Sequence, residues 1–140
     1  MLDKAKLKNP DKKFILGDIL NMPFQNEEFD CATIAFGLRN IENRTLAISE
    51  IHRILKKGGL LLHLDFGKHN LISKIFNITT PFCIKIFAKN KSSYEYLIKS
   101  KNDYPEPDEL INEFQNSGFK LINKKYYLFN AVSSQIFQKI

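Results

Sequence analysis

Three short segments carry side chains that can do chemistry, and each follows an apolar run. Gly17–Ile19 contains a carboxylate next to an aliphatic side chain, Phe36–Asn40 contains an aromatic ring, a guanidinium and an amide, and Asp65–His69 contains a carboxylate, an ammonium and an imidazole. A carboxylate beside an aliphatic side chain suits a purine, because the first accepts from the exocyclic amine and the second covers the ring.

Each of these residues also has a purely structural interpretation. Asp18 can cap a turn, and Asp65 can cap a loop. Arg39 can pair with Glu42 on the surface, and His63 can be a histidine at the edge of the core. Taken one at a time, the structural role is favoured for most of them.

The elements that must position these segments alternate between strands and helices. Apolar runs predict strands at Phe14–Leu16, Asp30–Phe36 and Leu60–Phe66, and the second run is apolar enough to be covered on both faces. A helix is expected over Asn43–Lys57, capped by Asn43 and stopped by Gly58. Strand, helix and strand in this order predict parallel pairing, which places the carboxyl ends of the strands at one edge of the sheet, where open α/β sheets bind ligands.

The rest of the chain continues as one domain over residues 1–140. Residues 69–103 form an apolar, lysine-edged segment interrupted by Pro81, in which Ser92 and Glu95 fit a capping box. Pro107 is expected to open a helix that ends at Gly118. Phe119–Ile140 predicts two strands connected near Asn130.

Composition limits the function classes. With 140 residues, 44% of them hydrophobic, the chain is long and apolar enough for one folded domain, which excludes disorder as its main state. The net charge of +6 comes from 18 Lys and only 3 Arg, so no nucleic-acid partner is expected, with RNA binding as a minor alternative. Cys31 and Cys83 cannot build a disulfide framework or a zinc site, and no metal is expected. Without a spanning or signal segment, a reducing cytoplasm is the expected compartment.

Taken in order, the motifs are more specific than any one of them alone. The stretch GDILNMPFQNEEFDCATIAFGLRN, followed by RILKKGG and LHLDF, resembles the ubiquinone/menaquinone biosynthesis C-methyltransferase family, a class of S-adenosylmethionine (SAM)-dependent enzymes. The segment YEYLIKS and the turn at Gly118 match further signals of that family. FGLRN is close to diagnostic of it. The resemblance implies an α/β fold that is the C-terminal part of a seven-stranded, Rossmann-like methyltransferase sheet.

Part of the family's pattern is missing. No glycine precedes Gly17, so the glycine-rich SAM loop and the acid that holds the ribose are absent, together with the first two strands of the sheet. Smaller departures are Lys57 for proline, Asp65 for glutamate and Gly67 for serine. These losses expose one edge of Asp30–Phe36, which predicts self-association or a complementary N-terminal fragment as partner.

The resemblance also implies roles for individual residues. The family methylates a ring carbon of a polyprenylated hydroquinone, and Arg39 would stabilise the phenolate that this requires. The residues that would bind SAM are Asp18 and Ile19 at the adenine and Ala35 at the methionine part. Those that would bind the quinol are Phe36, Gly37, Asn40, Asp65 and Tyr94. The apolar segment Leu71–Phe87 would cover the prenyl tail and touch the inner face of a membrane, with its lysines toward anionic headgroups.

Three interpretations remain open on the sequence. The chain is a truncated or split form of a SAM-dependent quinone-biosynthesis methyltransferase, a non-catalytic remnant of one, or a basic binding module without catalysis. A segment encoding a glycine-rich loop directly upstream in the gene would favour the first.

Overall fold

The computed structural model describes residues 2–67, 96, 100 and 104–140. Its helices and strands are, in chain order, α1 (Leu2–Lys8), β1 (Phe29–Ala35), the short 3₁₀ helix η1 (Leu38–Asn40), α2 (Arg44–Ile54), β2 (Leu55–Phe66), α5 (Pro107–Asn116), β3 (Phe119–Tyr127) and β4 (Val132–Lys139). None of the described helices has the length and apolar character that a membrane crossing requires.

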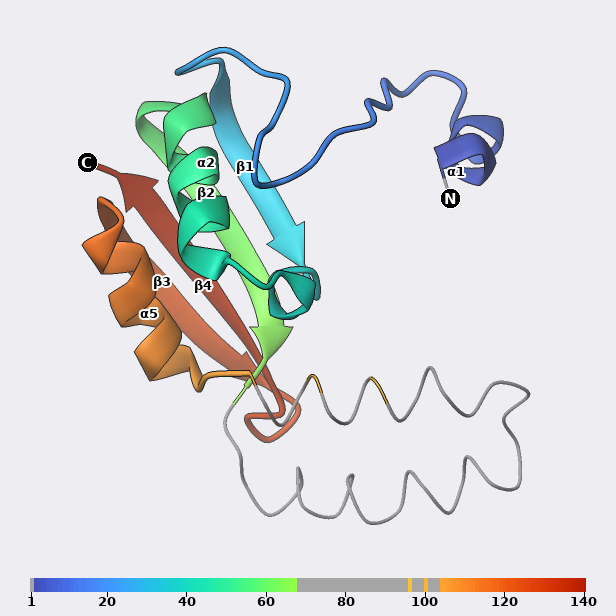
Figure 1. The fold of residues 1–140 in the computed structure, drawn as a ribbon. Coiled ribbons are helices and arrows are strands. Elements are labelled where there is room, and N and C mark those ends of the chain that lie inside the picture. Colours follow the sequence, from blue (N-terminus) through green and yellow to red (C-terminus); the bar gives the residue numbers. More distant parts are fainter. Residues whose placement is uncertain (1, 68–95, 97–99, 101–103) are drawn as a thin grey trace, which may run out of the picture.

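The four strands form one mixed sheet in the order β1-β2-β4-β3. β1 and β2 pair in parallel, whereas β4 is antiparallel to both of its neighbours. Helices α2 and α5 lie on the same face of this sheet, and α1 lies away from it (Figure 1). The parallel crossover, the helix at Pro107 and the final pair of strands are therefore confirmed.

Helix α2 forms where its apolar spacing predicts it. Ala47, Ile48, Ile51 and Ile54 are buried on one side of the helix. The Asn43 side chain caps the first turn by accepting from the Leu46 amide at 3.0 Å, as expected. The helix ends at Ile54 rather than Lys57, because Leu55 already pairs with β1 and its carbonyl accepts from the Lys139 ammonium at 2.8 Å.

The core lies between the helices and one face of the sheet. Its centre is aromatic: the Phe114 ring of α5 stacks on Phe137 of β4 at 4.3 Å and meets Phe119 of β3 edge to face at 5.9 Å. Gly118 turns the chain from α5 into β3 with a φ of +87°, a conformation that favours glycine. The C-terminal half of the sheet is thus anchored around three phenylalanines.

Two predictions for the N-terminal half are wrong. Phe14–Leu16 is not a strand; this region contains only an isolated bridge between Asp18 and Asn21, and Leu16 is 82% exposed. A strand needs a hydrogen-bonded neighbour, and the outer edge of β1 has none among the described strands. β1 is also not covered on both faces, because Cys31, Thr33 and Ala35 are exposed.

One side of the sheet is not covered by any of the described helices, and several of its side chains are apolar. The register places Thr33 beside Leu62 and Ala35 beside Leu64. The alternating burial of β1 and β2 puts these residues on the side away from the core. We define the open face as Thr33, Ala35, Leu60, Leu62, Leu64 and Ile136. Leu60 and Leu62 are 37% and 39% exposed, which is high for leucines in the middle strand of a sheet. The predicted substrate-covering segment 69–103 lies outside the described residues, except for Tyr96 and Ser100.

Candidate functional site

The chain turns sharply where β1 ends. Phe36 has a φ of 51°, in the left-handed region that non-glycine residues rarely adopt. Its amide donates to the Leu64 carbonyl of β2 at 2.9 Å, and its carbonyl accepts from the Arg39 Nη1 at 2.6 Å and from the Asn40 Nδ2 at 3.4 Å. Such a backbone costs on the order of 1 kcal/mol, which these bonds offset. The turn places η1, and with it Arg39, at the carboxyl end of the sheet.

Arg39 and Asp65 form an ion pair across the ends of the two parallel strands. The Arg39 Nη1 lies 3.5 Å from the Asp65 Oδ1, and the two side chains are only 10% and 0% exposed. The guanidinium also lies over the Phe66 ring, 5.1 Å from its centroid. Arg39 therefore pairs with Asp65 and is not a surface residue bonded to Glu42.

The pair is incompletely satisfied. Asp65 Oδ1 accepts from the Phe66 amide at 2.9 Å, but Asp65 Oδ2 and Arg39 Nε have no hydrogen-bond partner among the described residues. Burial raises the pKa of Asp65, while the Phe66 amide, His63 and Arg39 oppose that rise. A buried cation with a free N–H at the carboxyl ends of parallel strands can stabilise an anion that forms there.

Behind this pair lies a row of buried polar side chains. The Tyr104 hydroxyl is 3.3 Å from His63 Nε2, and His63 Nδ1 is 2.6 Å from the Gln135 side-chain oxygen. The Gln135 amide donates to Ser133 Oγ at 3.0 Å, and Ser133 donates to the Phe66 carbonyl at 3.2 Å. His63 is thus a buried structural histidine, and burial lowers its pKa. Sequence reasoning missed Tyr104 and Gln135; the polar residues at the inward positions of β4 were the available signal.

A cavity of about 300 Å³ opens beside Arg39. It is lined by Arg39, Ile41, Glu42, Arg44, Tyr96, Ser100 and Tyr104. The Tyr96 hydroxyl donates to the Asn40 Oδ1 at 3.1 Å, which connects the cavity to the turn at Phe36. Arg44 is held by Glu113 through two bonds of 3.0 and 3.2 Å and lies over the Tyr104 ring. The cavity therefore has cationic and phenolic walls.

The structure brings together Phe36, Gly37, Arg39, Asn40 and Asp65, but not the residues expected at the adenine. Ile19 lines a second, apolar cavity of about 660 Å³ between the segment before β1, β1 itself and α2. Asp18 is exposed, and its carboxylate accepts from the Leu20 amide at 3.0 Å. Ala35 lies at the end of β1, paired with Leu64. Tyr94 lies outside the described residues.

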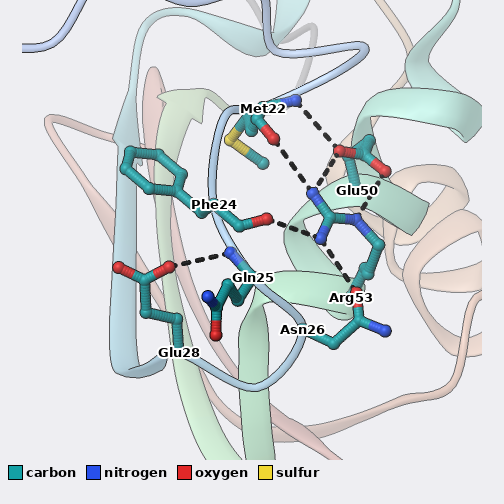
Figure 2. Close-up of polar contacts among 7 residues, drawn as sticks. All are labelled: Met22, Phe24, Gln25, Asn26, Glu28, Glu50 and Arg53. Carbon is teal, nitrogen blue, oxygen red and sulfur yellow. Dashed lines mark hydrogen bonds and ion pairs between the residues drawn. The ribbon is translucent and has the colours of Figure 1, made fainter.

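One arginine holds the segment that leads into β1. Arg53 of α2 donates to the carbonyls of Phe24 and Met22 at 2.8 and 3.1 Å and to the side chain of Asn26 at 2.9 Å (Figure 2). Glu50, one helical turn earlier, pairs with Arg53 at 2.9 Å and accepts from the Met22 amide at 3.0 Å. This arginine is the first residue of the RILKKGG motif, and its hydrogen bonds to the Met22 and Phe24 carbonyls hold the MPF motif against α2. Its role was not predicted from the sequence.

Comparison with known proteins identifies the family. The model of the ubiE/COQ5 methyltransferase family matches residues 1–139. The chain belongs to this family. It is 34% identical to the ubiquinone/menaquinone biosynthesis C-methyltransferase UbiE of Campylobacter jejuni, covering 100% of this chain and 63% of the relative. It is 36% identical to the demethylmenaquinone methyltransferase of Staphylococcus carnosus, covering 89% of this chain and 54% of that relative.

Solved structures confirm the fold of this family member. A SAM-dependent methyltransferase from Aquifex aeolicus superposes with a TM-score of 0.68 at 11% identity, over 99% of this chain and 61% of that one. One from Thermotoga maritima gives a TM-score of 0.66 at 20% identity, over 97% and 69%. The predicted Rossmann-like methyltransferase class is therefore correct. The chain spans less than two thirds of the length of both sequence relatives named above.

Proposed function

We propose that this chain is the carboxyl-terminal part of a SAM-dependent methyltransferase that methylates a ring carbon of a polyprenylated hydroquinone. The observation that carries the proposal is the Arg39 guanidinium, which lines the 300 Å³ cavity while Asp65 holds it from behind. Membership of the ubiE/COQ5 family supports the reaction class.

The chemistry explains why such a site needs a cation. A phenol's ring carbon is a weak nucleophile until the hydroxyl loses its proton, because the phenolate delocalises charge onto the ring. In the proposed reaction that carbon bonds to the methyl carbon as the methyl–sulfur bond breaks, and the ring then loses its C–H proton to restore the aromatic system. Arg39 would stabilise the phenolate directly or through a water, and the pair with Asp65 would fix its position.

The described residues fit only one side of the cofactor. SAM supplies an electrophilic methyl group when it is bound. Ile19 beside an apolar cavity suits the adenine ring, and Asp18 suits its amine, while Ala35 and the turn at Phe36 would contact the methionine part. The given sequence has no glycine before Gly17 and therefore no glycine-rich turn in that part. The remaining contacts would come from a second polypeptide segment.

The open face and the free edge of β1 indicate where that segment would bind. The open face is largely apolar, and the outer edge of β1 has no strand partner in the part of the chain that the structure describes. The two features adjoin each other along Thr33 and Ala35. The family relatives carry additional sequence that this chain does not match. We therefore propose the N-terminal methyltransferase segment as the partner, with self-association as the alternative. The prenyl tail and peripheral membrane contact are assigned to Leu71–Phe87 from the sequence only.

A two-piece assay tests the function. This chain would be coexpressed with the part of C. jejuni UbiE that it does not match, and methyl transfer from labelled SAM to a reduced demethylmenaquinol would be measured. We expect labelled product only when both pieces are present. Arg39→Ala should lower turnover about 100-fold and change SAM affinity little, because the guanidinium faces the phenolate. Complex formation without any transfer would favour the non-catalytic remnant.

A further inference from the structure

The Phe66 carbonyl at the end of the buried polar row behind Arg39 decides which group in the row donates each hydrogen bond. The Phe66 carbonyl can only accept, so Ser133 uses its hydroxyl proton there. The Ser133 oxygen then accepts from the Gln135 amide nitrogen, which turns the Gln135 oxygen toward His63. That oxygen also can only accept.

The tautomer of His63 follows from this order. His63 must carry its proton on Nδ1 in order to donate to Gln135, so the neutral ring has a bare Nε2. Burial disfavours the doubly protonated ring at neutral pH. The Tyr104 hydroxyl, 3.3 Å away, therefore donates its only proton to Nε2. Among the described residues its oxygen has no further hydrogen-bond partner, and toward any other group it can only accept.

Tyr104 also lines the cavity beside Arg39, at a residue exposure of 5%. Tyr104, Arg39 and Arg44 all line this cavity. A ligand group that reaches the Tyr104 oxygen can only donate to it, whereas the two guanidinium groups only donate. A hydroquinone offers a hydroxyl proton to the first and, once ionised, an oxyanion to the second. An oxidised quinone offers carbonyl oxygens only, and one placed against Tyr104 would set two acceptors against each other.

We infer that Tyr104, oriented through His63, Gln135 and Ser133, is a specificity-determining residue that makes the cavity select a reduced hydroquinone over the oxidised quinone. The inference rests on the proposed function, which supplies the hydroquinone as the ligand. It adds Tyr104 as the residue that distinguishes the reduced from the oxidised ring. A site whose polar groups are left unpaired by one of two ligands discriminates against that ligand.

Anaerobic equilibrium dialysis of the purified chain tests this inference. The probe is 2,3-dimethyl-1,4-naphthoquinone and its hydroquinone, because both reactive ring positions are blocked against addition of the exposed Cys31 thiol. We expect the hydroquinone to bind about ten-fold more tightly than the quinone. Tyr104→Phe should bring that ratio close to one by weakening the hydroquinone. The control is Tyr127→Phe, which removes a hydroxyl from the exposed side of β3 and should leave the ratio unchanged.

A second measurement examines the orientation directly. The ¹⁵N chemical shifts of His63 should show a protonated Nδ1 and a bare Nε2, and Gln135→Leu should remove that preference and lower the redox ratio. A protonated Nε2 in the unaltered chain would overturn the inference, as would equal affinity for the two redox forms. Failure of both forms to bind would overturn the proposed quinol site as well, so the two failures are distinguishable.

Discussion

Arg39 follows β1, and Asp65 lies at the end of β2, the adjacent parallel strand. Their charged groups are 3.5 Å apart, and this ion pair connects the two strand ends at the candidate site. Because the carboxylate is buried, the cation that faces the cavity has a fixed counter-charge behind it. Removing either partner therefore affects stability as well as chemistry.

Arg39→Met should lower the free energy of unfolding by about 3 kcal/mol at pH 8, because it leaves a buried carboxylate without its cation. The pKa of Asp65 is already raised by burial and should rise further in the variant. A raised folded-state pKa means that stability is lost as the pH rises above the unfolded value of 3.8, so the deficit should shrink toward acid. Urea unfolding between pH 5 and 8 measures it.

The double variant Arg39→Met/Asp65→Asn is the matched control for that experiment. It removes the charge as well as its partner, so most of the lost stability should return. An equal loss in the single and double variants would show that Arg39 stabilises through packing on Phe66 and not through its charge.

His63 should make the fold sensitive to mild acid. Burial lowers the pKa of its folded form, so below pH 6.5 the unfolded chain binds a proton that the folded chain does not. Stability should therefore fall with decreasing pH, by up to about 1.4 kcal/mol per pH unit for one such group. His63→Gln should flatten this slope. The raised pKa of Asp65 has the opposite effect, because it increases stability as the pH falls. The pH dependence with and without His63→Gln is therefore best compared in chains that also carry Asp65→Asn.

His52 provides the comparison for His63. Burial and then Lys139 lower its pKa, but it is only partly buried. His52→Gln should therefore remove less of the acid dependence than His63→Gln. A larger effect from His52 would contradict the assignment.

Arg53→Lys should loosen the segment before β1, because a single ammonium cannot replace a guanidinium that contacts Met22, Phe24, Asn26 and Glu50 together (Figure 2). Hydrogen exchange at the Met22 amide should accelerate on the order of ten-fold, with little change in the core of β4. Lys56→Arg alters the neighbouring, exposed pair with Asp30 and should leave this exchange unchanged.

The chain alone should bind SAM weakly or not measurably. The given sequence has no glycine-rich loop before Gly17, and each lost polar contact costs about 1 to 3 kcal/mol. Titration calorimetry would measure this, first with the chain and then with the two-piece complex. Low-micromolar binding by the chain alone would show that the described residues form a complete cofactor site.

The purified chain should self-associate through β1 and the open face. Thr33→Lys places a charge on that face and should shift the chain toward monomer in sedimentation velocity, since a charge on an edge strand opposes its pairing with another chain. Ser49→Lys adds the same charge on the exposed side of α2 and should not. A stable monomer before any substitution would contradict the open-face proposal.

The sequence by itself determined the elements whose signals are local. Asn43 and the apolar spacing of α2 specify a helix start, Pro107 and Gly118 bound α5, and the apolar runs of β1 and β2 specify strands, because caps and periodicity act within a few residues. The FGLRN motif indicated the family, and the match of the family model to residues 1–139 confirms it.

Only the tertiary structure decided what depends on distant partners. Phe14–Leu16 has the apolar composition of a strand but no neighbour to pair with among the described strands, so it stays irregular. Asp65 becomes a buried counter-charge only because β1 and β2 pair in parallel and place Arg39 over it. Tyr104 meets His63 across 41 residues of chain, and no local pattern encodes a contact that packing alone creates.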